Sequence, residues 1–437
     1  MWPQTKQVSE AVRLSRLRLV PFLLLMYVLA FLDRTNIGFA KQAFQASAGV
    51  SDAAYAFGAG LFFVTYALLE IPSNLIMHRV GARIWMARIM VTWGLTSAAL
   101  MFARGPMSFY ILRVLLGSAE AGLFPGVILY LTYWFPKTYL GQVVGLFYFG
   151  APLAFILGGP LSGLLLEMRG LGLQGWQWMF LTEGLLASMV GVWAFFYLDD
   201  MPPDAGWLPT AEKEALAAVI ARENLGKISP RLKAVLANPR VLHCVVIYFL
   251  IQASIYGVIF YLPAQVAALL GVQIGSKVGM VTAIPWVCAM AATYFVPRLA
   301  DRSGKHRVIA TATLAVSAIG IAFSATNRPA LGMVALCVAA AAFMAVQPIF
   351  WTFPATYLRG VAAASGIALI NALGALGGFV APNIRNWAEV RFHSPRAGLY
   401  VLAGAAFLGS LLILGLRNDV SRDAPGIAAL KSSDEEF

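Results

Sequence analysis

The sequence predicts an all-α integral membrane protein in which twelve transmembrane helices form two six-helix bundles. Of its 437 residues, 60% are hydrophobic and only 12% are charged, whereas about 25% of the residues in a soluble domain carry charge. Twelve apolar runs reach the length of roughly 20 residues that crosses a bilayer. Short motifs also recur between the two halves of the chain, which indicates that the bundles are repeats of one another.

A polar stretch in the middle of the chain divides the spans into two sets of six. We expect spans at residues 19–40, 55–77, 83–103, 107–131, 142–166, 176–198, 241–264, 277–298, 307–326, 330–353, 361–384 and 397–416. Residues 1–198 then form an N-terminal bundle, 199–240 a cytoplasmic central loop, and 241–437 a C-terminal bundle with a cytoplasmic tail. The helical pattern at 210–223 is expected to be a solvated surface element.

The basic residues predict the orientation of the protein in the membrane. Lys and Arg concentrate in the loops on the side of the N-terminus, so we expect both termini in the cytoplasm and the chain in the inner (plasma) membrane. The formal charge of +12 is not evidence for nucleic-acid binding, because these residues lie in short loops between apolar runs. The four histidines and three cysteines are scattered, so no metal site is expected.

Two loop motifs appear once in each half. The segment FPKTYL at 135–140 returns as FPATYL at 353–358, and RVGAR at 79–83 is echoed by DRSGK at 301–305. Both pairs fall in equivalent loops at nearly the same spacing. Parallel repeats of this kind describe a transporter fold with its site near the bilayer midplane.

Ionisable residues interrupt the apolar runs of the first half, and four of them carry the argument. Asp33 and Arg34 lie near the end of the first run, and Arg113 and Glu120 lie in the fourth. Intramembrane charge is costly and by default marks function. Arg113 and Glu120 share a helix face, and Asp33 has the depth of Arg113, so an Asp33–Arg113 pair is expected. The alternatives are that Asp33 and Arg34 mark a helix end and that Arg113 and Glu120 brace neighbouring helices; apolar packing would brace at lower cost.

These residue types point to anion transport coupled to protons. The planar fork of an arginine matches a carboxylate, and a carboxyl group removed from water can hold a proton near neutral pH. Asp33 and Glu120 are therefore the expected proton carriers, and Arg113 and Arg34 the candidates for the anion. Spacing does not decide which arginine meets the substrate.

Further candidates are polar or aromatic residues of the spans and of the repeated loops. Packing or interface anchoring is the alternative for each aromatic residue. For substrate contact they are Tyr66, Gln347, Trp351 and Asn371; for gating or structure they are Glu70, Asn74, Arg79, Arg83, Asp301 and Arg302. Glu183, in the sixth span, has no assigned role.

The motifs together resemble a known family. The loop echoes and the fourth-span pattern 113–122 resemble the major facilitator superfamily. DRTNIG at 33–38, EIPSN at 70–74 and YWFP at 133–136 resemble its anion:cation symporter branch, above all the tartrate and phthalate permeases. The chain departs from that pattern at KTYLGQ (137–142), where relatives often have an arginine-rich loop. It also departs at Ala375, often a second Asn, and at Tyr261, often a Trp.

This resemblance implies proton-driven uptake of an organic carboxylate by alternating access, carried out by a monomer. It implies proton coupling at Asp33 and Glu120, anion binding at Arg113, and positions facing a central cavity at Tyr66 and Asn371. We therefore expect a symporter for a small carboxylate such as tartrate or phthalate, with the proton as coupling ion and no other cofactor. Its expected partners are the organic anion, protons and the lipid bilayer, with no nucleic acid.

Two alternatives remain open at this point. The first is a sugar-acid symporter, for galactonate- or glucarate-like substrates. The second is a membrane sensor built on a transporter scaffold, which would need a signalling domain. An enzyme is not expected, because the spans hold no nucleophile–base set and no metal cluster.

Overall fold

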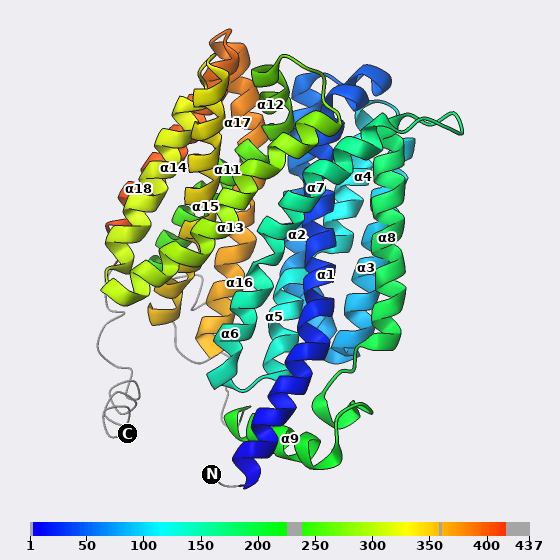
Figure 1. The fold of residues 1–437 in the computed structure, drawn as a ribbon, viewed down its shortest axis with the longest axis vertical. Helices are drawn as coiled ribbons and strands as arrows, with labels where there is room; N and C mark the ends of the chain where they lie inside the picture. The colour runs from blue at the N-terminus through cyan, green and yellow to red at the C-terminus, as the bar shows by residue number, and fades with distance from the viewer. Residues whose placement is uncertain (1–2, 225–237, 358–360, 417–437) are drawn as a thin grey trace.

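A computed structural model describes residues 3–224, 238–357 and 361–416. Within these ranges, twelve helices are long and apolar enough to cross a membrane, which confirms the predicted fold class. Figure 1 shows them standing roughly side by side, with α1 beginning at the same end at which α9 lies. We call this end the α9 end and the other the opposite end.

The N-terminal half contains six spans, of which two are broken into consecutive helices. They are α1 (Pro3–Ala48), α2 (Asp52–Val80), α3 (Ala82–Ala99, continued by η1, Leu100–Phe102), α4 (Gly105–Glu120) with α5 (Leu123–Trp134), α6 (Lys137–Tyr148) with α7 (Gly150–Glu167), and α8 (Gly175–Tyr197). Within this half α3 packs on α8, α2 on α4, and α1 on α7 and α8.

The C-terminal half repeats the arrangement. Its helices are α11 (Pro239–Ile259) with α12 (Leu262–Leu270), α13 (Ser276–Ser303), α14 (His306–Phe323), α15 (Pro329–Tyr357), α16 (Val361–Ala375) with α17 (Gly377–Arg391), and α18 (Pro395–Ile413). The two halves meet where α7 packs on α13 and where α2 packs on α16 and α17 (Figure 1).

Breaks in the spans have local causes. Between α4 and α5, Gly122 has φ +91°, a left-handed conformation that a side chain would strain. At the start of α12, Pro263 lacks the amide hydrogen that a continuous helix would use. The eleventh span continues to Arg391 instead of ending at 384, because Arg385 and Glu389 pair within the helix and so remain in it.

The helix expected at 210–223 is present at the surface of the protein, with several exposed residues and one face packed on the N-terminal half. After η2 (Pro202–Asp204), α9 (Thr210–Asn224) packs on the extended start of α1, and Leu216 is fully buried. Just before it, Trp207 stacks on Trp134 with ring centroids 5.6 Å apart. Its indole nitrogen donates to Asp199 Oδ2 at 2.8 Å. Residues 199–224 thus pack on the N-terminal half.

Candidate transport site

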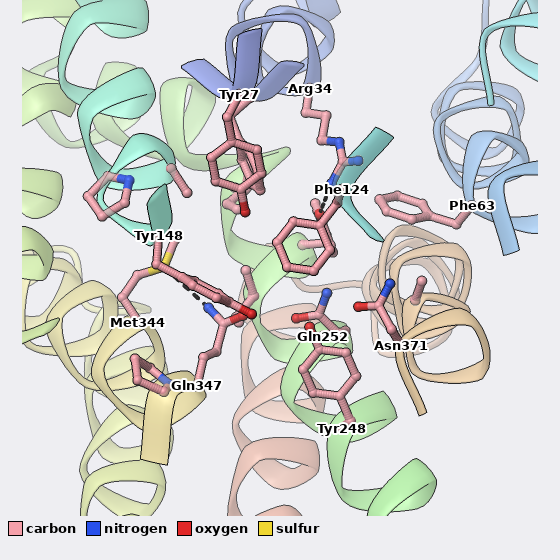
Figure 2. A pocket seen from close by; sticks show the side chains of 18 of the residues that line it. Tyr27, Arg34, Phe63, Phe124, Tyr148, Tyr248, Gln252, Met344, Gln347 and Asn371 are labelled. Carbon is pink, nitrogen blue, oxygen red and sulfur yellow. Dashed lines mark hydrogen bonds between the residues drawn. The ribbon is translucent and has the colours of Figure 1, made fainter. Parts of the chain in front are cut away.

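A cavity of about 80 Å³ lies between the two halves near the middle of the spans. Three amides of the C-terminal half, Gln252, Gln347 and Asn371, line it together with five tyrosines. In the described part of the chain, Arg34 is the one charged residue of the lining. Figure 2 shows Arg34 and Tyr27 on one side of the space, with Gln252, Gln347 and Tyr248 on the other. The lining can therefore bind one negative charge and several hydroxyl or carbonyl groups.

Arg34 is held in this cavity by partners from both halves. Its Nε donates to Glu120 Oε1 at 3.0 Å, and its Nη2 makes a second, short hydrogen bond to the same oxygen. Its Nη1 donates to the hydroxyl of Tyr256, on α11, at 2.9 Å. The guanidinium carbon also lies 5.2 Å from the centre of the Tyr66 ring. Arginine, acid and tyrosine thus form a charged cluster inside the protein.

Glu120 is the acidic member of that cluster. It ends α4 directly before the break at Gly122, and its carboxyl group meets Arg34 at the cavity. The side chain is 1% exposed. While Oε1 accepts from Arg34, Oε2 finds no hydrogen-bond partner among the described residues. The carboxyl group therefore depends on Arg34 or on a proton for its stability.

Asp33 points away from the cavity, into the N-terminal half. Successive helical residues project about 100° apart, so neighbouring Asp33 and Arg34 face different surroundings. Asp33 Oδ2 accepts from the indole of Trp93 at 3.1 Å, and Oδ1 accepts a short hydrogen bond from Ser97. Both partners lie on α3. Asp33 thus ties α1 to α3.

The expected direct pair between Asp33 and Arg113 is wrong: the salt bridges among the described residues do not include it. Arg113 is 3% exposed. Its Nη2 donates to the carbonyl of Ala59 at 2.8 Å and its Nε to that of Gly58 at 3.3 Å, both on α2. It is absent from the described lining of the cavity. The resemblance implied anion binding at Arg113, but the arginine in the cavity lining is Arg34, and Arg113 lies between α4 and α2.

Three of the four polar or aromatic residues expected to contact the substrate lie in the cavity wall. Tyr66, Gln347 and Asn371 line the cavity, as expected. Trp351 is not among the described lining residues; it packs against Tyr248, with ring centroids 4.8 Å apart. Tyr248 itself reaches the cavity, so Trp351 supports the wall from behind.

Glu70 and Asn74 lie deeper along α2, toward the α9 end. Glu70 is fully buried and accepts a hydrogen bond from Asn371 at 2.7 Å. Asn74 donates to the backbone carbonyl of Glu70 at 2.8 Å. Both also border a wide vestibule of about 990 Å³ that is lined by α2, α5 and α9. The space on the α9 side is therefore much larger than the central cavity.

The repeated loops lie at the α9 end and make local contacts. The backbone amide of Arg83 donates to Asp200 Oδ1 at 2.8 Å, which caps the start of α3. Asp301 pairs with His306 at 2.9 Å. Arg79 and Arg302 are exposed. These contacts lie within one half each, and the structure brings none of the four residues to the cavity lining that it describes.

At the opposite end the halves are in contact above the cavity. The ring of Tyr261, between α11 and α12, has Arg385 of α17 at 3.9 Å and Lys41 of α1 at 4.8 Å from its centre. Lys41 also pairs with Asp52 at 2.8 Å. Gly60 of α2 lies so close to α17 that an added Cβ would come within 2.8 Å of the Phe379 carbonyl oxygen. The opposite end is thus closed.

Sequence reasoning missed several residues of the cavity wall. Tyr27, Phe124 and Tyr148 line it, yet each stands in an apolar run in which aromatic residues are common. The signal that could have found Tyr27 is its spacing from Arg34, since the two are seven residues apart and therefore share a helix face. Tyr148 lies where α6 ends, and the sequence did not indicate that break.

Two helix bundles with a polar cavity between them define a multi-pass membrane transporter. The family profile described as Major Facilitator Superfamily matches residues 23–382, and the chain belongs to this superfamily. It is 50% identical to the inner membrane transport protein RhmT of Escherichia coli, over 94% of this chain and 96% of that protein. It is 42% identical to a protein of Agrobacterium vitis named "Putative tartrate transporter", over 93% and 91% of the two chains.

Solved structures show the same fold. The crystal structure of a D-xylose-proton symporter superposes with a TM-score of 0.73 and covers 92% of this chain and 97% of its own. The sequence identity is 15%, so this likeness concerns the fold alone.

Proposed function

We propose that this protein is a secondary transporter that takes up a small hydroxylated carboxylate together with protons, by alternating access. The observation that carries the proposal is the Arg34–Glu120 pair, a cation in the cavity neutralised by a buried acid. Relatives named as transporters, at 50% and 42% identity, support transport as the activity.

The pair supplies a physical reason for coupling. A substrate carboxylate needs the donors of Arg34, which Glu120 occupies in this structure. Two carboxylates at one guanidinium repel each other, and the repulsion is strong where water is excluded. A proton on Glu120 removes one of the two charges and frees the fork. Substrate and proton are therefore favoured together, and each alone is disfavoured.

Asp33 is the second proposed proton carrier. It is one residue from Arg34 and 5% exposed, and both of its hydrogen-bond donors, on Trp93 and Ser97, lie on α3. Protonation of its carboxyl group would weaken these contacts, because a neutral acid accepts less strongly than a carboxylate. A proton on Asp33 would thereby change how α1 packs on α3.

The lining favours a hydroxylated substrate over an aromatic one. Gln252, Gln347 and Asn371 offer amide donors and acceptors, and tyrosine hydroxyls surround them. A site built to hydrogen-bond hydroxyl groups rejects an analogue that lacks them, because its own polar groups stay unpaired. Tartrate and sugar acids meet this requirement, whereas phthalate has no hydroxyl group. The one arginine of the described lining suits a substrate with a single carboxylate. A sugar acid with one carboxylate, such as galactonate, is therefore the second candidate beside tartrate.

The two ends indicate the side of the membrane to which the cavity is closed. The basic loops favour a cytoplasmic α9 end, and the closed opposite end would then face outward. With the vestibule on the α9 side, this conformation corresponds to a transporter about to release its substrate inward, in the inner (plasma) membrane.

Uptake into proteoliposomes tests the proposal. Purified protein is reconstituted with an alkaline interior, and accumulation of radiolabelled L-tartrate, D-galactonate, D-glucarate and phthalate is followed with and without the pH gradient. We expect accumulation of a hydroxylated acid that collapses when a protonophore dissipates the gradient. Uptake of phthalate alone would refute the substrate class, and accumulation indifferent to the protonophore would refute proton coupling.

A further inference from the structure

A partly buried hydrogen bond joins the two halves below the cavity. The amide nitrogen of Asn371, on α16, donates to Glu70 Oε1, on α2, at 2.7 Å. A second side-chain hydrogen bond between the halves, that of Arg34 with Tyr256, lies in the cavity itself. The contact between Asn371 and Glu70 is the one that lies toward the α9 end.

This contact forms part of the partition between two spaces. Asn371 belongs to the lining of the central cavity, and Glu70 to the lining of the vestibule at the α9 end. Glu70 lies one helical turn beyond Tyr66, whose side chain also reaches the cavity. Figure 2 shows the Asn371 amide at the edge of the cavity beside Gln252. Anything that moves from cavity to vestibule along α2 passes this pair.

Glu70 is weakly held for a buried acid. Its Oε2 finds no partner among the described residues, and no salt bridge in the described part of the chain includes it. Glu120, by comparison, has the guanidinium of Arg34. A buried carboxyl group with one donor and a free oxygen is unfavourable. It gains free energy when water reaches it, and the vestibule beside it is where that water would enter.

The donor that Glu70 uses is also one that a substrate would use. An asparagine side chain has two amide hydrogens and one carbonyl oxygen. One hydrogen is given to Glu70, whose carboxyl oxygen resembles that of an organic acid. A substrate oxygen that turns the Asn371 amide into the cavity takes this hydrogen from Glu70, because the bond to Glu70 requires the amide to reach across to α2.

We propose that Glu70 is a positioning residue that holds Asn371 across the floor of the cavity until a substrate carboxylate or hydroxyl takes the amide. The pair is then broken and the cavity opens toward the α9 end. This inference rests on the function proposed above only for the identity of the ligand. The inter-half hydrogen bond closes the floor whatever the substrate is.

Labelling of a single cysteine from the α9 side tests the closure. The reporter Ala151→Cys, in the cavity wall, is placed in a chain whose Cys244, Cys288 and Cys337 are replaced by alanine. A second reporter, Ala221→Cys, lies in the vestibule wall and is exposed. The reaction of Ala221→Cys with a membrane-impermeant maleimide shows what fraction of the vesicles exposes the α9 side. The labelling rate of Ala151→Cys is then divided by the rate of Ala221→Cys.

Removing either partner should open the floor. We expect Glu70→Ala and Asn371→Ala each to raise Ala151→Cys labelling about tenfold, the population shift that one lost hydrogen bond to a carboxyl group produces. Glu70→Gln keeps an acceptor oxygen and should label like the parent. Asn383→Ala is the matched control, because that amide bonds Ala56 and Phe379 at the opposite end, and it should leave the rate unchanged.

A double mutant and a ligand complete the test. The double variant Glu70→Ala/Asn371→Ala should label no faster than either single variant, since one contact is removed in all three. L-tartrate or D-galactonate, whichever is transported, should accelerate labelling in the parent but add nothing in Glu70→Ala. Size-exclusion profiles and melting temperatures check that each variant is folded.

The outcomes separate this inference from the proposed function. Labelling within twofold of the parent in both single variants overturns the closure, and so does fast labelling in the Asn383→Ala control. Fast labelling in the variants with no response of the parent to a transported ligand overturns release by substrate. Failure of every carboxylate in the uptake assay would refute the proposed function, whereas the ligand-free labelling rates would still decide the closure.

Discussion

Replacing Arg34 by alanine should weaken substrate binding far more than replacing Arg113. Arg34 makes three donor contacts in the cavity, two to Glu120 and one to Tyr256, and an entering carboxylate would take over those now given to Glu120. A hydrogen bond to a charged group is worth about 1.5–3 kcal/mol. Loss of one such bond therefore weakens binding by about 10- to 150-fold at 1.36 kcal/mol per factor of ten.

Arg113 provides the contrast. Its donors are spent on the buried carbonyls of Gly58 and Ala59, so Arg113→Ala leaves two carbonyls unsatisfied and removes nothing from the described cavity wall. We expect a loss of stability of about 1.5–3 kcal/mol, with affinity kept in the folded fraction. Arg34→Lys keeps a charge but lacks the planar fork, and its affinity should fall between those of wild type and Arg34→Ala.

Isothermal titration of purified, monodisperse protein with the transported carboxylate measures these affinities, and a thermal melt in the same detergent measures stability. Affinity of Arg34→Ala within about threefold of wild type would refute the assignment of the substrate arginine, because a single charged hydrogen bond is worth at least tenfold. An Arg113→Ala variant that melts like wild type and no longer binds the carboxylate would also refute the assignment of Arg34 as the substrate arginine.

Three further perturbations test other parts of the structure. Glu120→Gln and Asp33→Asn should each abolish accumulation driven by a pH gradient while counterflow exchange survives; unchanged accumulation in both would exclude these acids as carriers. Tyr261→Leu removes a ring that two cations flank, worth about 0.5–2 kcal/mol, and should raise cysteine labelling from the opposite end by about 2- to 30-fold; parental labelling would contradict its role in closure. Trp207→Ala loses the stack on Trp134 and should cost about 1–3 kcal/mol in a thermal melt, whereas an unchanged melting temperature would contradict the docking of the central loop.

The architecture was readable from the sequence because its signals are local. A membrane helix is recognised by the length of its own apolar run, and the repeated loop motifs relate the halves without any knowledge of contacts. The ionisable residues were equally visible, since a charge in an apolar run stands out wherever its partner lies. The ends of the spans were harder to predict from the sequence. The break at Gly122 depends on a backbone angle. The helix α1 extends to Pro3 because its first turns pack on α9.

The site was only half predictable. Arg34, Tyr66, Gln347 and Asn371 were named and lie in the cavity wall, whereas the pairing of Asp33 with Arg113 was inferred from equal depth alone. Depth gives the position of a side chain along the membrane normal, but not the direction in which it leaves the helix. That direction is set by the rotation of the helix about its axis, which turns Asp33 toward α3 and Arg34 toward the cavity.

The sequence by itself determined the membrane class, the twelve spans, the two related halves and the set of buried charges, because each follows from residues close together in the chain. The tertiary structure alone decided which charges meet. Arg34 meets Glu120 across 86 residues, and Glu70 meets Asn371 across 301. The physical reason is that a buried charge takes the partner that helix rotation and helix packing place beside it, and neither is written in the spacing of residues along a single span.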